Sequence, residues 1–103
     1  MAWATAGILT NPAIDTILAD SGALAGGQSE ATIIVGGSVA AIYTIEHRNA
    51  ANTANVNSQV VASVLNEAKQ YWLPGISFAA SERIRVRLNA AVVGSLQASV
   101  FTF

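Results

Sequence analysis

The sequence predicts an all-β fold: a single-domain, antiparallel β-sandwich of the jelly-roll kind. β-Branched runs outnumber helical patterns, and residues 83–88 alternate strictly between polar and apolar side chains. Turn-forming residues recur at short intervals, which is typical of a sandwich built from many short strands. These turn positions are Ser21-Gly22, Gly26-Gly27, Gly36-Gly37, Pro74-Gly75 and Gly94. A chain of 103 residues has room for one hydrophobic core.

The N-terminal residues 1–12 are predicted to form an arm or extended segment, and residues 13–103 the sandwich. Residues 1–7 contain no cationic region and no long apolar core, so we expect no secretory leader. The longest uncharged stretch, 1–14, is interrupted by Gly7 and Pro12 and is shorter than the roughly 20 apolar residues of a bilayer span. We therefore expect a soluble chain made inside a cell, with no membrane partner.

Residues 11–20 have two interpretations. Asn11 followed by Pro12 is typical of a helix start, whereas Thr16 and Ile17 favour a strand. A strand fits the rest of the chain better. Residues 31–35 and 39–47 are β-branched runs separated by Gly36-Gly37, and we expect them to form a hairpin with a bulge.

Residues 49–59 are rich in asparagine and carry no charge, which indicates a loop or an extended arm. Asn52 and Asn55 are candidates for binding the backbone of a partner chain, although a solvated loop has the same composition. In residues 60–72, Val61, Leu65 and Trp72 lie at helical spacing while Val60 favours a strand. One short helix here is left open, and it does not change the fold class.

Residues 83–88 form the clearest strand of the sequence. Ile84, Val86 and Leu88 are expected to face the core, since alternate side chains of a strand point to opposite faces. After a turn near residues 93–95, residues 96–103 are expected to pair antiparallel with this strand.

The composition of the chain indicates that it assembles with further copies of itself. A folded monomer of this mass exposes about 5,500 Å². The eleven charged residues would then each protect about 500 Å², close to the largest apolar patch that a monomer normally tolerates. Lys69 is the single lysine, and lysine is depleted at interfaces. We expect an obligate homo-oligomer; the alternative is an alanine-rich monomer with a neutral polar surface.

Sequence motifs for catalysis and for cofactors are missing. Without cysteine there are no disulfides, thiolate nucleophiles or thiolate metal sites. His47 is the single histidine, and in a strand its neighbours Glu46 and Arg48 point to the opposite face. No Gly-x-Ser-x-Gly elbow and no metal-ligand spacing occurs. We therefore predict no enzymatic activity, no cofactor and no metal.

The arginine strand places Arg83, Arg85 and Arg87 on one face. Nucleic acid is disfavoured as their partner, because the net charge is −1 and no second basic cluster exists. We expect these arginines to pair with carboxylates of the same or a neighbouring subunit; simple solvation is the alternative. The candidate carboxylates are Glu46, Glu67 and Glu82.

Aromatic side chains are candidate interface anchors, since Trp and Tyr are enriched at buried contacts. A sugar-binding platform of Trp3, Tyr71 and Trp72 is the alternative. The candidate interface with another subunit or a partner protein therefore consists of Trp3, Ile8, Leu9, Asn52, Asn55, Tyr71, Trp72, Arg83, Arg85 and Arg87.

A family resemblance covers roughly the last 60 residues. It is carried by Glu46-His47-Arg48-Asn49-Ala50-Ala51-Asn52, by Leu73-Pro74-Gly75 and by Glu82-Arg83-Ile84-Arg85-Val86. These strings resemble small β-sandwich structural proteins of tailed bacteriophages. The nearest class is the capsid decoration, or cement, proteins.

The resemblance implies a homotrimer on the virion surface that braces the major capsid protein or another virion protein. It implies no catalytic residues. In that case residues 1–12 would order on the shell or on a sister subunit. Two alternatives stay open: another phage part, such as a neck, tail or head-fibre module, and a carbohydrate-binding sandwich for host adhesion.

Overall fold

The computed structural model describes residues 2–5 and 7–103, with side chains described from residue 7 onward. This part of the chain is all-β: 54% of it is strand, no helix is present, and two sheets pack face to face. The predicted β-sandwich is confirmed. Its strands are β1 (Ala2–Thr5), β2 (Leu9–Thr10), β3 (Ile17–Asp20), β4 (Glu30–Gly37), β5 (Ala41–Arg48), β6 (Asn55–Ser63), β7 (Ala68–Pro74), β8 (Arg83–Leu88) and β9 (Ser95–Thr102).

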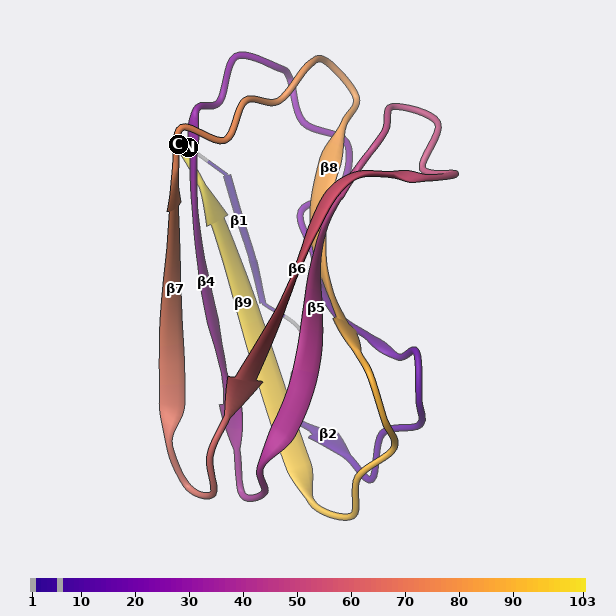
Figure 1. The fold of residues 1–103 in the computed structure, drawn as a ribbon, viewed down its shortest axis with the longest axis vertical. Coiled ribbons are helices and arrows are strands. Elements are labelled where there is room, and N and C mark those ends of the chain that lie inside the picture. Colours follow the sequence, from indigo (N-terminus) through magenta and orange to yellow (C-terminus); the bar gives the residue numbers. More distant parts are fainter. Residues whose placement is uncertain (1, 6) are drawn as a thin grey trace.

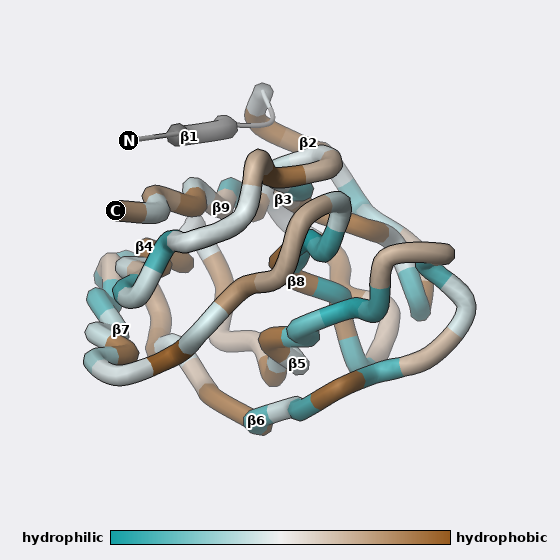
Figure 2. The backbone as a smooth tube through the Cα atoms, turned by 90° about the horizontal axis from the view of Figure 1, so that it is seen from above, coloured by the Kyte–Doolittle hydropathy of each residue, from teal (hydrophilic) through white to brown (hydrophobic). Residues whose placement is uncertain are grey.

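The two sheets are antiparallel throughout (Figure 1). Sheet A has the order β1-β9-β4-β7, with β2 also pairing with β9. Sheet B has the order β3-β8-β5-β6. Seen from above, β6 and β7 lie on one side of the sandwich, while β1, β2 and β3 lie on the other (Figure 2). We call the β6–β7 side the open side.

The core fills the space between the sheets. Ile84, Val86 and Leu88 are fully buried, as the alternating pattern predicts. From sheet A they meet Ile33 and Val35 on β4 and alternate residues of β9, so both inner faces contribute. The largest fully buried side chains are Tyr43, Leu18, Ile33, Ile84, Leu88, Leu96, Val35, Val86, Val100 and Thr102.

The predicted hairpin between residues 31–35 and 39–47 is wrong. β4 pairs with β7 and β9 in sheet A, whereas β5 pairs with β6 and β8 in sheet B. Gly36 and Gly37 lie inside β4, where neighbouring backbone comes very close. A Cβ atom on Gly37 would lie 2.0 Å from the Ser95 carbonyl oxygen, and one on Gly36 would lie 2.7 Å from the Glu67 carbonyl oxygen. Because these two residues have no side chain, neighbouring backbone can approach them closely. The chain crosses to the other sheet after them.

The predicted pairing of residues 96–103 with the arginine strand is also wrong. β9 pairs with β4 and with the N-terminal strands, while β8 pairs with β3 and β5. The connection 89–94 therefore crosses between the sheets. Local alternation shows which side chains of a strand are buried, but it does not show which strand lies beside it.

The remaining local predictions have different outcomes. Residues 17–20 form a strand, as favoured, and the short helix left open for residues 60–72 is replaced by β6, a turn and β7. Tertiary pairing overrides the helical spacing, because each strand gains a neighbour in a sheet. The asparagine-rich segment is a loop only up to residue 54, after which it forms β6.

The N-terminal segment lies along sheet A. Ala2–Thr5 pairs with Ser99–Thr102 of β9, and Leu9–Thr10 pairs with Ser95 and Leu96. The backbone of Trp3 lies opposite Phe101. Over the described residues, no helix has the length and apolar character to cross a membrane.

Candidate functional site

The outer face of sheet B carries a network of ion pairs, in which Arg85, Glu46, Arg87 and Asp15 are linked and Arg83 and Asp20 form a separate pair. Arg85 Nε donates to Glu46 Oε1 at 2.7 Å, and Arg87 Nε lies 3.4 Å from Glu46 Oε2. Arg87 also binds Asp15 at 2.8 Å, and Arg83 lies 3.4 Å from Asp20. The β5–β8 register places Glu46 directly opposite Arg85, which explains the shortest of these contacts.

Glu46 is the centre of this network, and the Glu46 residue is only 3% exposed. Burial by itself raises the pKa of its carboxyl, but hydrogen bonds from Arg85 and Asn55 and the charges of Arg85 and Arg87 outweigh burial and lower that pKa. Glu46 therefore stays ionised and holds two arginines in place.

The arginine stripe is thus paired within one chain. The predicted partner Glu46 is confirmed, whereas the other carboxylates of the stripe are Asp15 and Asp20 rather than Glu67 or Glu82. Asp20 follows from the pairing of β3 with β8, where it lies opposite Arg85. Such long-range pairing carries no local sequence signal.

Asn52 and Asn55 make contacts inside the chain. Arg48 Nε donates to Asn52 Oδ1 at 2.9 Å, and one Arg48 terminal nitrogen donates to Asn55 Oδ1 at 2.9 Å. The Asn55 amide also donates to Glu46 at 3.1 Å. Asn52 has a left-handed backbone with φ of 55°, which asparagine tolerates well. These amides hold the 49–54 loop against the charged network.

His47 has a carboxylate partner that local spacing does not reveal. Its Nε2 lies 2.9 Å from Glu82 Oε1, and its ring packs on Phe78 with centroids 4.5 Å apart. The Glu82 pKa is lowered, first by a hydrogen bond from the Ala79 amide and then by the bond to His47. The His47 residue is 5% exposed and faces the inside of the sandwich, opposite to Glu46.

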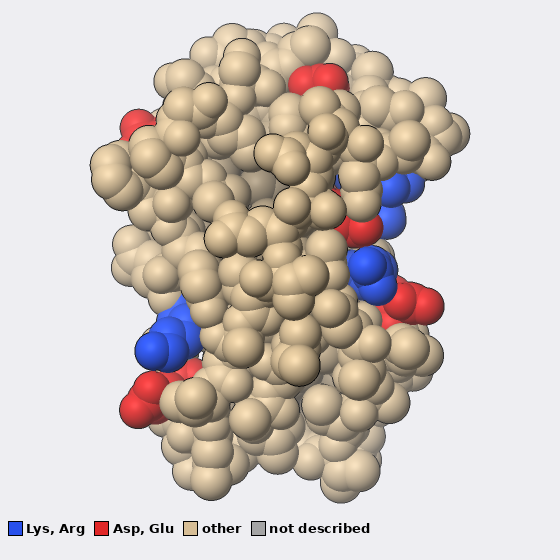
Figure 3. Space-filling view, viewed as in Figure 1, with Lys and Arg blue, Asp and Glu red and all other residues tan. Residues whose placement is uncertain are grey.

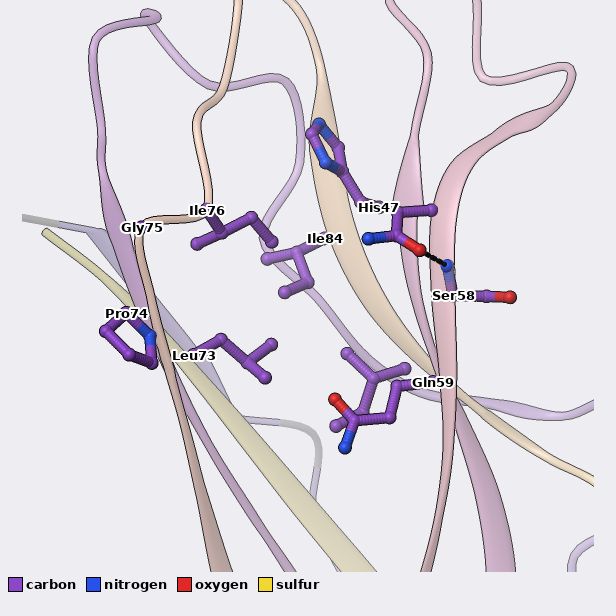
Figure 4. A pocket seen from close by; sticks show the side chains of 10 residues that line it. His47, Ser58, Gln59, Leu73, Pro74, Gly75, Ile76 and Ile84 are labelled. Carbon is purple, nitrogen blue, oxygen red and sulfur yellow. Dashed lines mark hydrogen bonds between the residues drawn. The ribbon is translucent and has the colours of Figure 1, made fainter.

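A pocket of about 450 Å³ opens between the sheets on the open side. Leu73, Ile76 and Ile84 converge in it, with His47 at one end and the Ser58 hydroxyl directed away (Figure 4). Its lining residues are Ile45, His47, Asn57, Ser58, Gln59, Leu73, Pro74, Gly75, Ile76 and Ile84. The lining is mixed: aliphatic side chains lie beside the polar side chains of His47, Asn57, Ser58 and Gln59.

The open side is bounded by the two edge strands β6 and β7. Tyr71 joins them: its hydroxyl donates to the Ala62 carbonyl at 2.5 Å and accepts the Ala62 amide at 3.2 Å. The view onto this side shows charged side chains near its margins and almost none across its centre (Figure 3). The large apolar side chains exposed on β6, on the following turn and on β7 are Val56, Val60, Val64, Leu65 and Trp72.

The predicted aromatic and apolar interface residues do not gather in one place. Tyr71 packs against the core, whereas Trp72 is 61% exposed and donates from Nε1 to Glu30 at 2.7 Å. Ile8 is exposed beside a second hollow, of about 370 Å³, that is also lined by β4 and β9, and Leu9 packs against the core. The side chain of Trp3 lies outside the described residues.

In the described part of the chain, the side-chain hydrogen bond of His47 goes to Glu82, and no hydroxyl is hydrogen-bonded to its ring. Within the same residues no group of three or more His, Asp or Glu side chains could hold a metal ion. No family model matches this chain, and no curated protein matches it.

Proposed function

We propose that this chain is a non-enzymatic structural protein of a virion, and that it self-associates and binds a capsid protein lattice to stabilise the head. The observation that supports this most is the open side, where two edge strands and several large apolar side chains are left uncovered by the chain itself. Exposed edges and apolar patches of this kind are typical of surfaces that another protein covers.

The distribution of charge supports the same proposal. The ion pairs of sheet B use six of the eleven charged side chains: Asp15, Asp20, Glu46, Arg83, Arg85 and Arg87. Glu82 binds His47 and Arg48 is held by asparagines. Little charge is left for the remaining part of the 5114 Å² surface, and an uncharged surface favours association.

In the proposed mechanism, the contact free energies of many copies add together. Each copy contributes about 25 cal/mol per Å² of apolar area that it buries, reduced by the cost of association. Many copies on a symmetric shell add these contributions, and the rigid two-sheet scaffold resists distortion because its core is closely packed. A trimer is the arrangement that the family resemblance implies.

Other phage parts, such as a neck, tail or head-fibre module, would use the same surface chemistry. Carbohydrate binding has less support, because the neighbours Tyr71 and Trp72 differ in direction. The Tyr71 hydroxyl is bound to Ala62, and the Trp72 indole lies beside Glu30. They do not form one aromatic platform.

The experiment adds the purified chain to phage heads assembled without it. We expect stoichiometric binding and a higher rupture temperature of the heads. Trp72→Lys places a charge on the edge of the open side and should weaken the binding at least tenfold, while Val93→Lys, at an 85% exposed position of the 89–94 connection, should leave it unchanged. Heads that take up no chain would contradict the proposal, and binding to a glycan array instead would favour host adhesion.

A further inference from the structure

The free edge of β6 has a defined extent. β6 is the last strand of sheet B, and the N–H and C=O groups of alternate residues point away from β5. Ala62 is one such residue, since both its backbone groups bind the Tyr71 hydroxyl. Ser58 and Val60 follow at the same alternation. Tyr71 ends the free edge at Ala62, which leaves residues 56–60 open for pairing.

This edge lacks the charged and proline residues that commonly keep edge strands apart in monomers, and its pairing with β5 is regular from Asn57 onward, with a register shift at Val56. Residues 49–66 contain no charged residue and no proline, and lysine and proline are the usual protection of an edge. The Ser58 amide donates to the side chain of its own neighbour, Asn57, at 2.9 Å. That contact satisfies a single donor, and it can be exchanged for a partner strand without breaking the β5–β6 ladder.

The edge sequence is complementary to itself. In an antiparallel pair centred on Ser58, Val56 of one copy, the residue at the register shift of β6, lies opposite Val60 of the other, so two exposed valines pack together. In the same register Asn57 lies opposite Gln59. Each amide side chain carries both donors and acceptors, so these two can bond to each other. Both matches occur twice, as a twofold axis requires.

The two valines of this edge are accessible to a partner. Val56 is 55% exposed and Val60 is 64% exposed in the single chain.

We propose that a second copy of this chain pairs with β6, antiparallel about a twofold axis at Ser58, and joins two four-stranded B sheets into one continuous sheet. This proposal rests on the self-association in the proposed function and names its contact. It differs from the threefold arrangement that the family resemblance implies. An extended peptide of another protein could occupy the same edge, and the test below distinguishes the two.

The register can be tested by disulfide formation, because the chain has no cysteine of its own. Paired residues of this type have Cα atoms about 5.5 Å apart, within the range of a disulfide. Ser58→Cys should therefore form covalent dimers on mild oxidation. Val56→Cys and Val60→Cys should each crosslink poorly alone but efficiently when mixed. Val93→Cys, which is exposed but remote from this edge, is the control.

The strength of the contact can be tested by measuring mass in solution. The unmodified chain should sediment at twice 10.6 kDa, and Val60→Lys should raise the dimer dissociation constant at least tenfold, whereas Val93→Lys should not change it. Circular dichroism would verify that both variants fold. Dimers without crosslinking of Ser58→Cys would overturn the register, and a trimer or a monomer would overturn the twofold contact.

These outcomes separate the two proposals. If the chain does not dimerise through β6 but binds to heads, the β6 contact is wrong and the proposed function stands. If it dimerises through β6 but heads take up none of it, the contact stands and the proposed function is wrong. Pairing of β6 with an added peptide, without dimers of the chain, would assign the edge to another protein.

Discussion

At the scale of single residues, the carboxylate of Glu46 holds several side chains of sheet B in place. It is buried on the outer face of sheet B, and three donors, from Arg85, Arg87 and Asn55, reach its two oxygens. A buried carboxylate is tolerated only where such partners compensate the loss of water. Since two of the partners are arginines, removing Glu46 leaves like charges side by side.

Glu46→Gln should therefore lower the free energy of unfolding by about 3 kcal/mol, the magnitude typical of breaking a buried ion pair. Urea denaturation measures this loss. Glu67→Gln is the matched control: Glu67 is exposed and belongs to none of the ion pairs of the network, so its effect should stay within about 0.5 kcal/mol. Equal losses in the two variants would contradict the central place of Glu46.

The lowered pKa values of Glu46 and Glu82 predict acid sensitivity. A carboxyl whose pKa is lower in the folded chain stabilises the fold at a pH above its unfolded pKa, near 4.5. That stability is lost as the pH falls from there through the folded pKa. The urea midpoint should be flat near neutral pH and fall below about pH 4.5. Glu46→Gln should reduce this fall, and an unchanged pH profile would be evidence against the network.

At the scale of elements, β4 depends on its two terminal glycines. Neighbouring backbone lies so close to Gly37 that a methyl group there would overlap the Ser95 carbonyl oxygen. The strand must shift to accept any side chain, and β4 is the strand that β7 and β9 both use as a neighbour. A local change here is therefore passed to the whole of sheet A.

Gly37→Ala should destabilise the fold by about 2 kcal/mol or more, which is the usual size of overpacking in a close-packed region. Thermal unfolding followed by circular dichroism measures the effect. Gly7→Ala is the control, since a Cβ atom at Gly7 meets no atom within 4 Å. A stability loss confined to Gly7→Ala would be incompatible with the packing of β4.

At the scale of the whole molecule, the two sides of the sandwich differ. The outer face of sheet B holds six of the eleven charged side chains in ion pairs, whereas the open side exposes apolar side chains and two strand edges. A chain with this surface gains stability when copies cover the open side, because association then favours the folded state over the unfolded one.

The melting temperature should accordingly rise with protein concentration. A series from the micromolar to the millimolar range, measured by differential scanning fluorimetry, should show a steady increase in the unmodified chain and a smaller one in Val60→Lys. A constant melting temperature together with a monomeric mass at millimolar concentration would contradict self-association.

The sequence by itself determined the fold class and the inward side of the clearest strand. Alternation in residues 83–88 is a local property, and it correctly placed Ile84, Val86 and Leu88 in the core and the arginines outside. Glu46 was one of three candidate partners of the arginines, and the pairing of β5 with β8 selected it. These successes share a physical reason: the period of side chains along a strand is set by the backbone alone.

Only the tertiary structure decided which strands lie side by side. The Gly36-Gly37 pair suggests a hairpin locally, yet β4 and β5 belong to different sheets, and His47 meets Glu82 across 35 residues of sequence. The pocket and the free edge of β6 arise in the same way. Strand order depends on how two faces bury apolar area together, and that choice is made by contacts between residues far apart in the chain.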